Sequence, residues 1–271
     1  ERAVAYAKER VQFGTRLVEK QGYTHKLLVP HIVRLEAARA YIEKVARRLD
    51  SGEEDLQVEG AVAKYFATEA GDAAANDAIQ AFGGYGYMRE YEVEKIKRDV
   101  KITTIYEGTS EILQNVISMM RMREAVRTKG RYYLDMADGL AALPADTGAS
   151  AVAATLRVLA DVIQEARDLK LTKSQHVMFL LSDIMTWGEV AEALCHKAAE
   201  CQDGKKWSPE FTKAVARVFA RETVELASQN ASQILLGGDS PAPNAEAILA
   251  QLPKGYQAGL LKDMDLIAAE L

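Results

Sequence analysis

The chain has 271 residues, of which 48% are hydrophobic, and a formal net charge of −5 at pH 7. This charge argues against general nucleic-acid binding, because proteins of that class usually carry an excess of basic residues. No run of about eighteen apolar residues occurs, so we expect no membrane-spanning helix. Cys195 and Cys201 are too few for a disulfide framework, and the four histidines are scattered. We therefore expect a cytoplasmic protein without a metal site.

Helical periodicity dominates the chain from its first residues. Residues 1–10 already form an amphipathic pattern, and Pro30 predicts a kink or a helix boundary because proline lacks a backbone N–H group. Ser208 followed by Pro209 is typical of a helix start. Turn residues at 50–54, 201–209 and 237–244 separate the helical patterns. We expect helices at 31–50, 57–82, from about Thr109 to about Asp138, 151–170, 176–202, 208–236 and a shorter tail at 243–269.

One segment between two helical patterns mixes glycine, proline, serine and aspartate, and it predicts a linker at 141–149. The fold class is therefore all-α. We expect residues 1–140 to form an antiparallel four-helix bundle whose first helix is incomplete, and residues 150–271 to form an additional helical bundle.

The run at 98–113 carries the clearest chemical signal. It places an acid, Glu107, between an aromatic residue and a glycine at the start of a helix, where Thr109 or Ser110 can cap. If Ile105 and Tyr106 form walls around this carboxylate, it is desolvated and becomes a usable general base. An isolated run of this kind is more often an ordinary helix-capping acid.

Two further runs accompany it. The run at 80–87, Gln-Ala-Phe-Gly-Gly-Tyr-Gly-Tyr, ends a long helix with three glycines that let the backbone approach a ligand closely. The run at 6–14 contains Arg10, whose planar donors suit a phosphate, and Gln21 follows it. Alone, the glycine run is usually a helix end and the arginine a surface residue.

Together, in this order and spacing, the three runs resemble the C-terminal helical domain of the acyl-CoA dehydrogenases, which are flavoenzymes. The family pattern is Arg-x-x-Phe-Gly, then Gln, then Gln-x-x-Gly-Gly-x-Gly-Tyr, then Arg-Asp-x-Lys-Ile, then Ile-Tyr-Glu-Gly-Thr, and each element stands in this sequence. The resemblance covers about the first half of the chain.

The resemblance implies that Glu107 removes the α-proton of an acyl-CoA thioester while FAD takes the β-hydrogen as hydride, giving a trans-2-enoyl-CoA. It further implies that the backbone N–H group of Glu107 stabilises the developing enolate and that Tyr106 and Gly108 lie beside the substrate. Electrons then pass to an electron-transferring flavoprotein.

The resemblance also implies a set of residues that contact FAD, partly FAD held by a neighbouring subunit. A homodimer or a dimer of dimers is therefore the expected assembly. Arg98, Lys101 and Lys95 are candidates for contacts with the anionic CoA, although we expect Arg98 to form an ion pair with Asp99 or Glu94 instead. The implied FAD contacts are Arg10, Gln12, Lys20, Gln21, Gln80, Ala81, Phe82, Gly83, Gly84, Thr109, Ser110 and Glu111.

The position of the acid at 107 narrows the range of expected substrates. Some branched-chain and long-chain relatives carry their base on an earlier helix, whereas this sequence has its acid at the more common position. A short- or medium-chain acyl group is therefore expected. Acyl-CoA oxidases share much of the motif set, so an oxidase-like enzyme is an alternative. A second alternative is a helical assembly module that positions FAD without turnover.

The second half of the chain extends beyond the helix that follows Glu107. This extension resembles the branch that includes the 3-methylmercaptopropionyl-CoA dehydrogenase. The family also has an N-terminal helical domain and a flavin-binding β-barrel, neither of which these residues contain. We therefore expect the chain to be the C-terminal part of a larger enzyme that neither holds FAD nor turns over substrate by itself. The alternative is a subunit that works beside a second polypeptide, which supplies the β-barrel.

Overall fold

The computed structural model describes residues 1–202 and 206–271, and these residues fold almost entirely into helices. The sequence prediction of an all-α protein is confirmed. The described β structure is one hairpin of two-residue strands near the N-terminus. The helices and strands are α1 (Arg2–Glu9), β1 (Val11–Gln12), β2 (Thr15–Arg16), η1 (Leu17–Glu19), α2 (Gln21–Leu27), α3 (Val29–Asp50), α4 (Gln57–Phe82), α5 (Gly84–Tyr87), η2 (Arg89–Tyr91), α6 (Val93–Lys101), η3 (Ile102–Thr104), α7 (Ser110–Arg127), α8 (Arg131–Leu140), η4 (Ala145–Thr147), α9 (Ala149–Asp168), η5 (Leu171–Lys173), α10 (Gln175–Glu200), α11 (Pro209–Leu236), α12 (Ala245–Leu249) and α13 (Leu260–Ala269).

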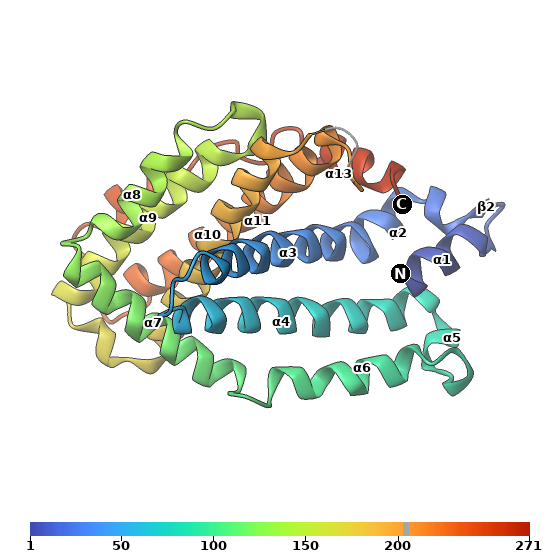
Figure 1. Ribbon diagram of the computed structural model, residues 1–271, viewed down its shortest axis with the longest axis horizontal. Helices are drawn as coiled ribbons and strands as arrows, with labels where there is room; N and C mark the ends of the chain where they lie inside the picture. The colour runs from blue at the N-terminus through green and yellow to red at the C-terminus, as the bar shows by residue number, and fades with distance from the viewer. Residues whose placement is uncertain (203–205) are drawn as a thin grey trace.

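The long helices α3 and α4 lie side by side and form the centre of the molecule (Figure 1). Helices α6 and α7 follow one another along the opposite side of α4, so that α6 covers one half of α4 and α7 the other. Helix α10 packs against α3 and α7, while α9 and α11 pack against α10. The turn between α6 and α7, which contains Glu107, therefore lies beside α4 at the lower edge of Figure 1.

Several predicted helix boundaries agree with the structure. Helix α4 has the predicted bounds, and α11 begins one residue after the predicted start, with the Ser208 hydroxyl accepting a hydrogen bond from the Phe211 N–H group. Pro30 marks a helix boundary as expected, since α2 ends at Leu27 and α3 begins at Val29. Part of the predicted turn at 201–209 lies outside the described residues.

Two predicted helices are wrong because each is divided in the structure. The helix expected from Thr109 to Asp138 ends at Arg127, and a second helix begins at Arg131 after left-handed backbone at Lys129 and Gly130. The tail expected at 243–269 contains α12 and α13 instead of one helix. Between them, Pro253 lacks a backbone donor and interrupts helical hydrogen bonding.

The main hydrophobic core extends across both halves of the chain. Helix α10 lies at its centre, where large side chains such as Leu181, Ile184 and Met185 are at most 1% exposed. Each such side chain contributes about 1.5–3 kcal/mol through burial. Because the core joins α3, α4 and α7 to α9, α10 and α11, the division at 141–149 into two domains stays a prediction about folding units.

A smaller hydrophobic cluster lies at the N-terminal end of the molecule. It joins α1 to the C-terminal end of α4 through Ala7, Ala81 and Phe82, and Leu271 packs against it from the C-terminus. The helix α13 thus lies against α2, although about 240 residues separate them in the sequence. No helix among the described residues combines the length and apolar character needed to cross a membrane.

Candidate active site

Glu107 lies in a tight turn between η3 and α7. Its φ angle is +53°, and the φ angle of Gly108 is +97°. Left-handed backbone at a residue other than glycine costs on the order of 1–3 kcal/mol and often occurs at functional sites. The Glu107 side chain is exposed, and Ile105 and Tyr106 are 48% and 54% exposed. Within this chain these two residues therefore leave the carboxylate open to solvent and do not form the walls that the sequence suggested.

The turn is attached to α4 on both sides of Thr109. The Lys64 Nζ of α4 donates a hydrogen bond of 2.7 Å to the Gly108 carbonyl oxygen. The Ser110 hydroxyl, which is buried, donates to the Glu69 carboxylate of the same helix. Between these contacts the Thr109 hydroxyl accepts from the Ile112 N–H group and caps α7, as the sequence predicted. The turn is therefore held by side chains from a neighbouring helix as well as by its own cap.

Sequence reasoning did not identify Lys64 or Glu69 as part of the site. Lys64 also lies 6.0 Å from the centroid of the Tyr106 ring, and burial lowers the pKa of its ammonium group. The available signal was weak, since Lys64 is a single lysine within the alanine-rich start of a long helix. Charged residues at such positions are usually solvated, so the sequence alone gave no reason to select it.

Glu111, in the first turn of α7, is exposed. Hydrogen bonds from its own backbone N–H group and from Thr109 lower the pKa of its carboxyl group. An ionised acid at this position stabilises the helix because the N-terminus carries a partial positive charge. In this chain the group is therefore a helix-stabilising anion whose exposed oxygens remain open to a ligand.

A second group of predicted residues lies at the other end of α4, around α1 and the hairpin. The Arg10 guanidinium stacks over the Tyr85 ring at 5.4 Å from its centroid. Lys20 donates to the Thr15 hydroxyl at 2.8 Å and lies over the ring of Phe13, which is 94% exposed at the hairpin tip. Gln12, on β1, is exposed. These basic and amide side chains surround an exposed hairpin that offers donors to an anionic ligand.

Gln21 contacts the C-terminal part of the chain. Its Nε2 donates to the Asp265 Oδ1 of α13 at 2.8 Å, and the His25 Nε2 lies 3.1 Å from the same oxygen. With the amide nitrogen engaged in this way, the Gln21 Oε1 is left as an acceptor. No sequence pattern predicted this contact, because 244 residues separate the partners.

The run at 80–84 contains both exposed and buried positions. Gln80, Gly83 and Gly84 are exposed, whereas Ala81 and Phe82 are 3% and 9% exposed. The Phe82 ring stacks on Tyr6 at 4.3 Å between centroids, and the Ala81 carbonyl accepts from the Tyr23 hydroxyl at 2.9 Å. The side chains of Ala81 and Phe82 therefore serve the small hydrophobic cluster, and a ligand at this end of α4 would meet Gln80 and the exposed glycine backbone.

The structure thus places the predicted site residues in two separate groups. Gln80 follows Lys64 by sixteen positions along α4, which corresponds to about 24 Å at the helical rise of about 1.5 Å per residue. One group surrounds Glu107, and the other surrounds Arg10. Within one chain they therefore cannot surround a single small ligand.

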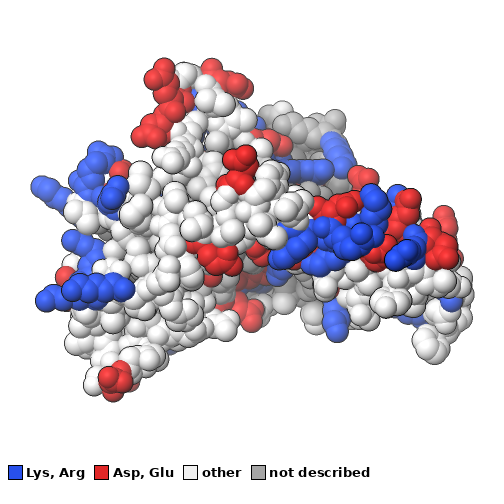
Figure 2. All heavy atoms as spheres, turned by 90° about the horizontal axis from the view of Figure 1, so that it is seen from below, with Lys and Arg blue, Asp and Glu red and all other residues white. Residues whose placement is uncertain are grey.

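The basic residues of α6 are paired with acids. Arg98 makes two hydrogen bonds of 2.9 and 3.1 Å to Glu94, which confirms one of the two expected partners, while Lys95 pairs with Asp99 at 2.8 Å. Figure 2, which shows the molecule from below, displays this mixture of blue and red side chains along its right half beside a largely uncharged centre. Positive charge on α6 is therefore compensated locally.

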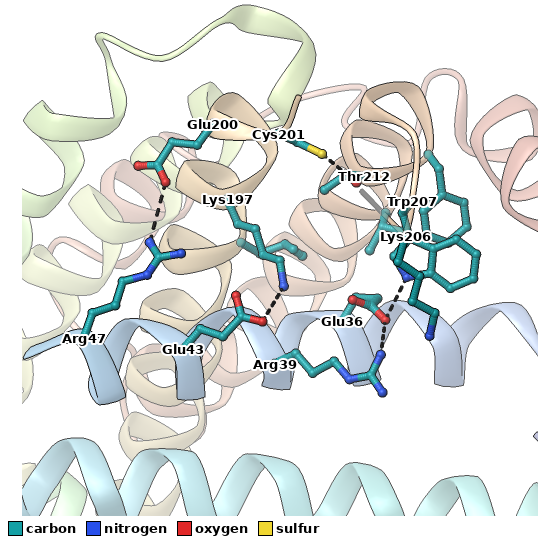
Figure 3. A pocket seen from close by; sticks show the side chains of 13 residues that line it. Glu36, Arg39, Glu43, Arg47, Lys197, Glu200, Cys201, Lys206, Trp207 and Thr212 are labelled. Atoms are coloured by element: carbon teal, nitrogen blue, oxygen red, sulfur yellow. Dashed lines mark hydrogen bonds and ion pairs between the residues drawn. The ribbon is translucent and has the colours of Figure 1, made fainter. Parts of the chain in front are cut away.

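A cavity of about 450 Å³ lies between α3, α10 and α11, away from the predicted site residues. Figure 3 shows ion pairs of Glu36 with Arg39, Glu43 with Lys197 and Glu200 with Arg47 among its side chains. Lys197 contacts Glu43 at 3.1 Å, and Glu36 accepts from both Arg39 and the Trp207 indole. Because these acidic side chains already have basic or donor partners, we interpret the cavity as part of the polar contact between α3 and the later helices.

The N-terminal part of the chain is similar to known proteins of one enzyme family. Residues 1–122 match the family model described as acyl-CoA dehydrogenase, C-terminal domain. An acyl-CoA dehydrogenase of Bacillus subtilis (strain 168) is 47% identical over 122 residues, which are 44% of this chain and 31% of that protein. The caffeyl-CoA reductase-Etf complex subunit CarC of Acetobacterium woodii is 38% identical over 122 residues, 45% of this chain and 32% of that protein. The chain therefore matches about a third of the length of these relatives.

A solved structure resembles nearly the whole chain. The crystal structure of an acyl-CoA dehydrogenase complexed with FAD from Bacillus anthracis gives a TM-score of 0.83 at 19% identity. The match covers 99% of this chain and 51% of that chain. At this identity the likeness shows the fold alone, but it includes the helices after residue 140 as well as those before it.

Proposed function

Because residues 1–122 belong to the acyl-CoA dehydrogenase family, we propose that this chain forms the C-terminal part of an FAD-dependent acyl-CoA dehydrogenase. The proposed reaction converts an acyl-CoA thioester to the trans-2-enoyl-CoA. The observation that carries the proposal is the exposed carboxylate of Glu107, held in left-handed backbone at the start of α7.

In this proposal Glu107 is the base that removes the α-proton of the thioester. A carboxylate can perform this step when the substrate covers it and excludes water, since desolvation strengthens a base. The turn stands at the N-terminus of α7, where the helix dipole is positive and favours an adjacent anion. The same end of the helix would stabilise the enolate that forms as the proton leaves. Tyr106 and Gly108 would border the acyl thioester.

FAD, when bound, supplies the acceptor for the β-hydrogen of the substrate. Residues of this chain fit such a ligand in two places. Thr109, Ser110 and Glu111 would lie near the cofactor of the same active site, beside Glu107. Arg10, Gln12, Lys20 and Gln21, with Gln80 to Gly84, would contact the nucleotide half of a cofactor held mainly by a neighbouring copy. The guanidinium, ammonium and amide donors at that end suit a pyrophosphate.

The separation of these two groups along α4 supports an assembly in which copies share their cofactor sites. We propose a homodimer or a dimer of dimers, with an electron-transferring flavoprotein as the electron acceptor. One relative is named as a subunit of a complex with such a flavoprotein, and this supports the choice. Turnover that continues with oxygen as the sole acceptor would contradict it and indicate oxidase chemistry.

The test of the catalytic proposal is Glu107→Gln in the complete FAD-loaded enzyme. We expect FAD to stay bound while dehydrogenation falls by at least about 10²–10⁴-fold, because amide cannot accept the α-proton. Glu124→Gln, on α7 and paired with Arg127, is the matched control and should leave the rate unchanged. A Glu107→Gln enzyme of nearly normal rate would show that this acid is not the base.

A second test uses the chain alone. After incubation with excess FAD and desalting, visible flavin absorbance should be absent, because we propose that other segments hold the flavin ring. Stoichiometric retention of flavin would contradict the view that these residues supply only part of the site.

We further propose a short- or medium-chain acyl group as substrate, because the proposed base lies in the turn before α7 and not on an earlier helix, as it does in some branched-chain and long-chain relatives. The ratio kcat/KM measured with butanoyl-, octanoyl- and palmitoyl-CoA should then be lowest for palmitoyl-CoA. A preference for palmitoyl-CoA would contradict the assignment of substrate length without affecting the assignment of the base.

A further inference from the structure

Lys64 contacts the turn that presents Glu107. Its Nζ donates 2.7 Å to the carbonyl oxygen of Gly108, the residue that directly follows Glu107. The lysine comes from the first half of α4, 43 residues earlier in the chain, so its contact depends on how α4 packs against the start of α7. A cation that donates to a carbonyl makes a stronger hydrogen bond than a neutral donor.

The turn requires such support because its backbone is unfavourable. Glu107 has a φ of +53°, a region that residues with a Cβ atom rarely adopt. Gly108, at φ +97°, can rotate to either sign of φ at little cost. If the Gly108 carbonyl were released, this glycine could turn and Glu107 could relax to negative φ, which would move its carboxylate.

A second contact holds the other side of the turn. The buried Ser110 hydroxyl donates to Glu69, one helical turn beyond Lys64 on α4. This contact holds the start of α7, whereas the peptide group between Gly108 and Thr109 is held by the hydrogen bond from Lys64. Partial burial of the ammonium group is consistent with a lysine committed to the turn rather than extended into water.

We propose that Lys64 is a positioning residue for Glu107. By holding the Gly108 carbonyl, it keeps the carboxylate in the orientation from which it removes the α-proton. This inference rests on the proposed role of Glu107 as the base. Without Lys64 the productive orientation would be only one of several, so the rate of the chemical step would fall in proportion to the fraction of molecules that still adopt it.

The test is Lys64→Met in the complete FAD-loaded enzyme. We expect kcat to fall by about tenfold or more, since small displacements of a catalytic group have large effects on rate. The KM for acyl-CoA and the FAD content should change little. Exchange of the substrate α-proton with D₂O, which reports proton removal directly, should slow by the same factor as kcat.

Two variants serve as controls. Lys64→Arg keeps a cationic donor near the carbonyl and should restore a substantial part of kcat. Lys97→Met removes another part-buried lysine that donates to a backbone carbonyl, that of Asp72 at 3.2 Å, but lies outside the turn. It should leave kcat and α-proton exchange unchanged, which separates positioning from a general loss of packing.

The inference is overturned if Lys64→Met keeps kcat and α-proton exchange within about twofold of the original enzyme. It is also overturned if Lys97→Met lowers both as much as Lys64→Met does. Should Lys64→Met fail to fold, Lys64→Gln replaces it with the same criteria. Glu107→Gln is measured alongside: if that variant remains active the proposed function fails, whereas an inactive Glu107→Gln beside an unaffected Lys64→Met refutes this inference alone.

Discussion

Arg121 and Glu189 form a bidentate ion pair inside the protein that joins α7 to α10. The Arg121 Nε and Nη2 atoms donate to the two Glu189 oxygens at 2.7 and 2.8 Å. The side chains are 7% and 3% exposed. The hydroxyl groups of Tyr41 and Tyr133 donate to the same carboxylate at 3.1 Å each. This network connects the matched N-terminal segment to the later helices through polar contacts inside the core.

Arg121→Met should therefore be strongly destabilising. Removing one partner leaves the Glu189 carboxylate buried without its cation, which typically costs about 3–5 kcal/mol. The matched control is Arg127→Met on the same helix, whose side chain is 74% exposed and which should change stability by less than about 1 kcal/mol. Urea denaturation followed by circular dichroism measures both. Equal effects of the two substitutions would contradict this interpretation.

Gly86 is required by close packing. A Cβ atom at this position would lie 2.2 Å from the Ile79 carbonyl oxygen, so the backbone would have to move. We expect Gly86→Ala to lower the free energy of unfolding by about 1–3 kcal/mol. At Gly60, within α4, a Cβ atom meets no other atom within 4 Å, so Gly60→Ala should stabilise by about 0.5–1 kcal/mol. Thermal unfolding of both variants tests the opposite signs, and a neutral Gly86→Ala would refute the packing argument.

Asp263 should make stability depend on acid pH. Burial alone would raise the pKa of its carboxyl group, but the guanidinium groups of Arg217 and Arg221, each 2.6 Å away, outweigh this and lower it below the ordinary value of 3.8. A carboxylate with a lowered pKa stabilises the fold above the unfolded value, and this contribution is lost as the pH falls through the folded value. Unfolding measured from neutral pH down to about pH 3 should show that Asp263→Asn is least stable, relative to the original chain, at neutral pH. A constant difference across this range would contradict the pKa assignment.

The contact between Gln21 and Asp265 should affect cofactor binding at the hairpin end of the chain. In the complete enzyme, Asp265→Ala frees the Gln21 amide, and we expect the Kd for FAD to rise about two- to tenfold, the effect of one hydrogen bond. Asp161→Ala is the matched control, because Asp161 accepts 2.8 Å from Gln251 in an equivalent pair elsewhere. Fluorescence titration of the apoenzyme with FAD measures both. An unchanged Kd for Asp265→Ala would show that the pair only joins α13 to α2.

Local sequence signals were sufficient to predict the long helices α4 and α11. The bounds of α4 and the start of α11 followed from periodicity and from the capping serine before Pro209, since these signals act within a few residues. The break between α7 and α8 was missed because apolar spacing continues across it, although Gly130 was a visible stop signal. A single turn residue is a weaker signal for a helix boundary than apolar periodicity over many residues is for a helix.

The candidate site divides in the same way. The acid at 107, the glycine after it and the capping threonine are neighbours in sequence, so their turn could be predicted from order alone. The partners of that turn, Lys64 and Glu69, lie about 40 residues earlier. Which face of α4 meets the turn depends on the rotation and register of two packed helices, and these follow from the whole core.

The sequence by itself therefore determined the helical class, the family motifs and the position of the acid, because each depends on local residue order. Only the tertiary structure decided that Ile105 and Tyr106 leave the acid exposed and that Arg121 is buried against Glu189. It also decided that the two groups of site residues lie at opposite ends of α4. These relationships arise between segments far apart in the chain, and they are fixed by the packing of helix faces rather than by any local pattern.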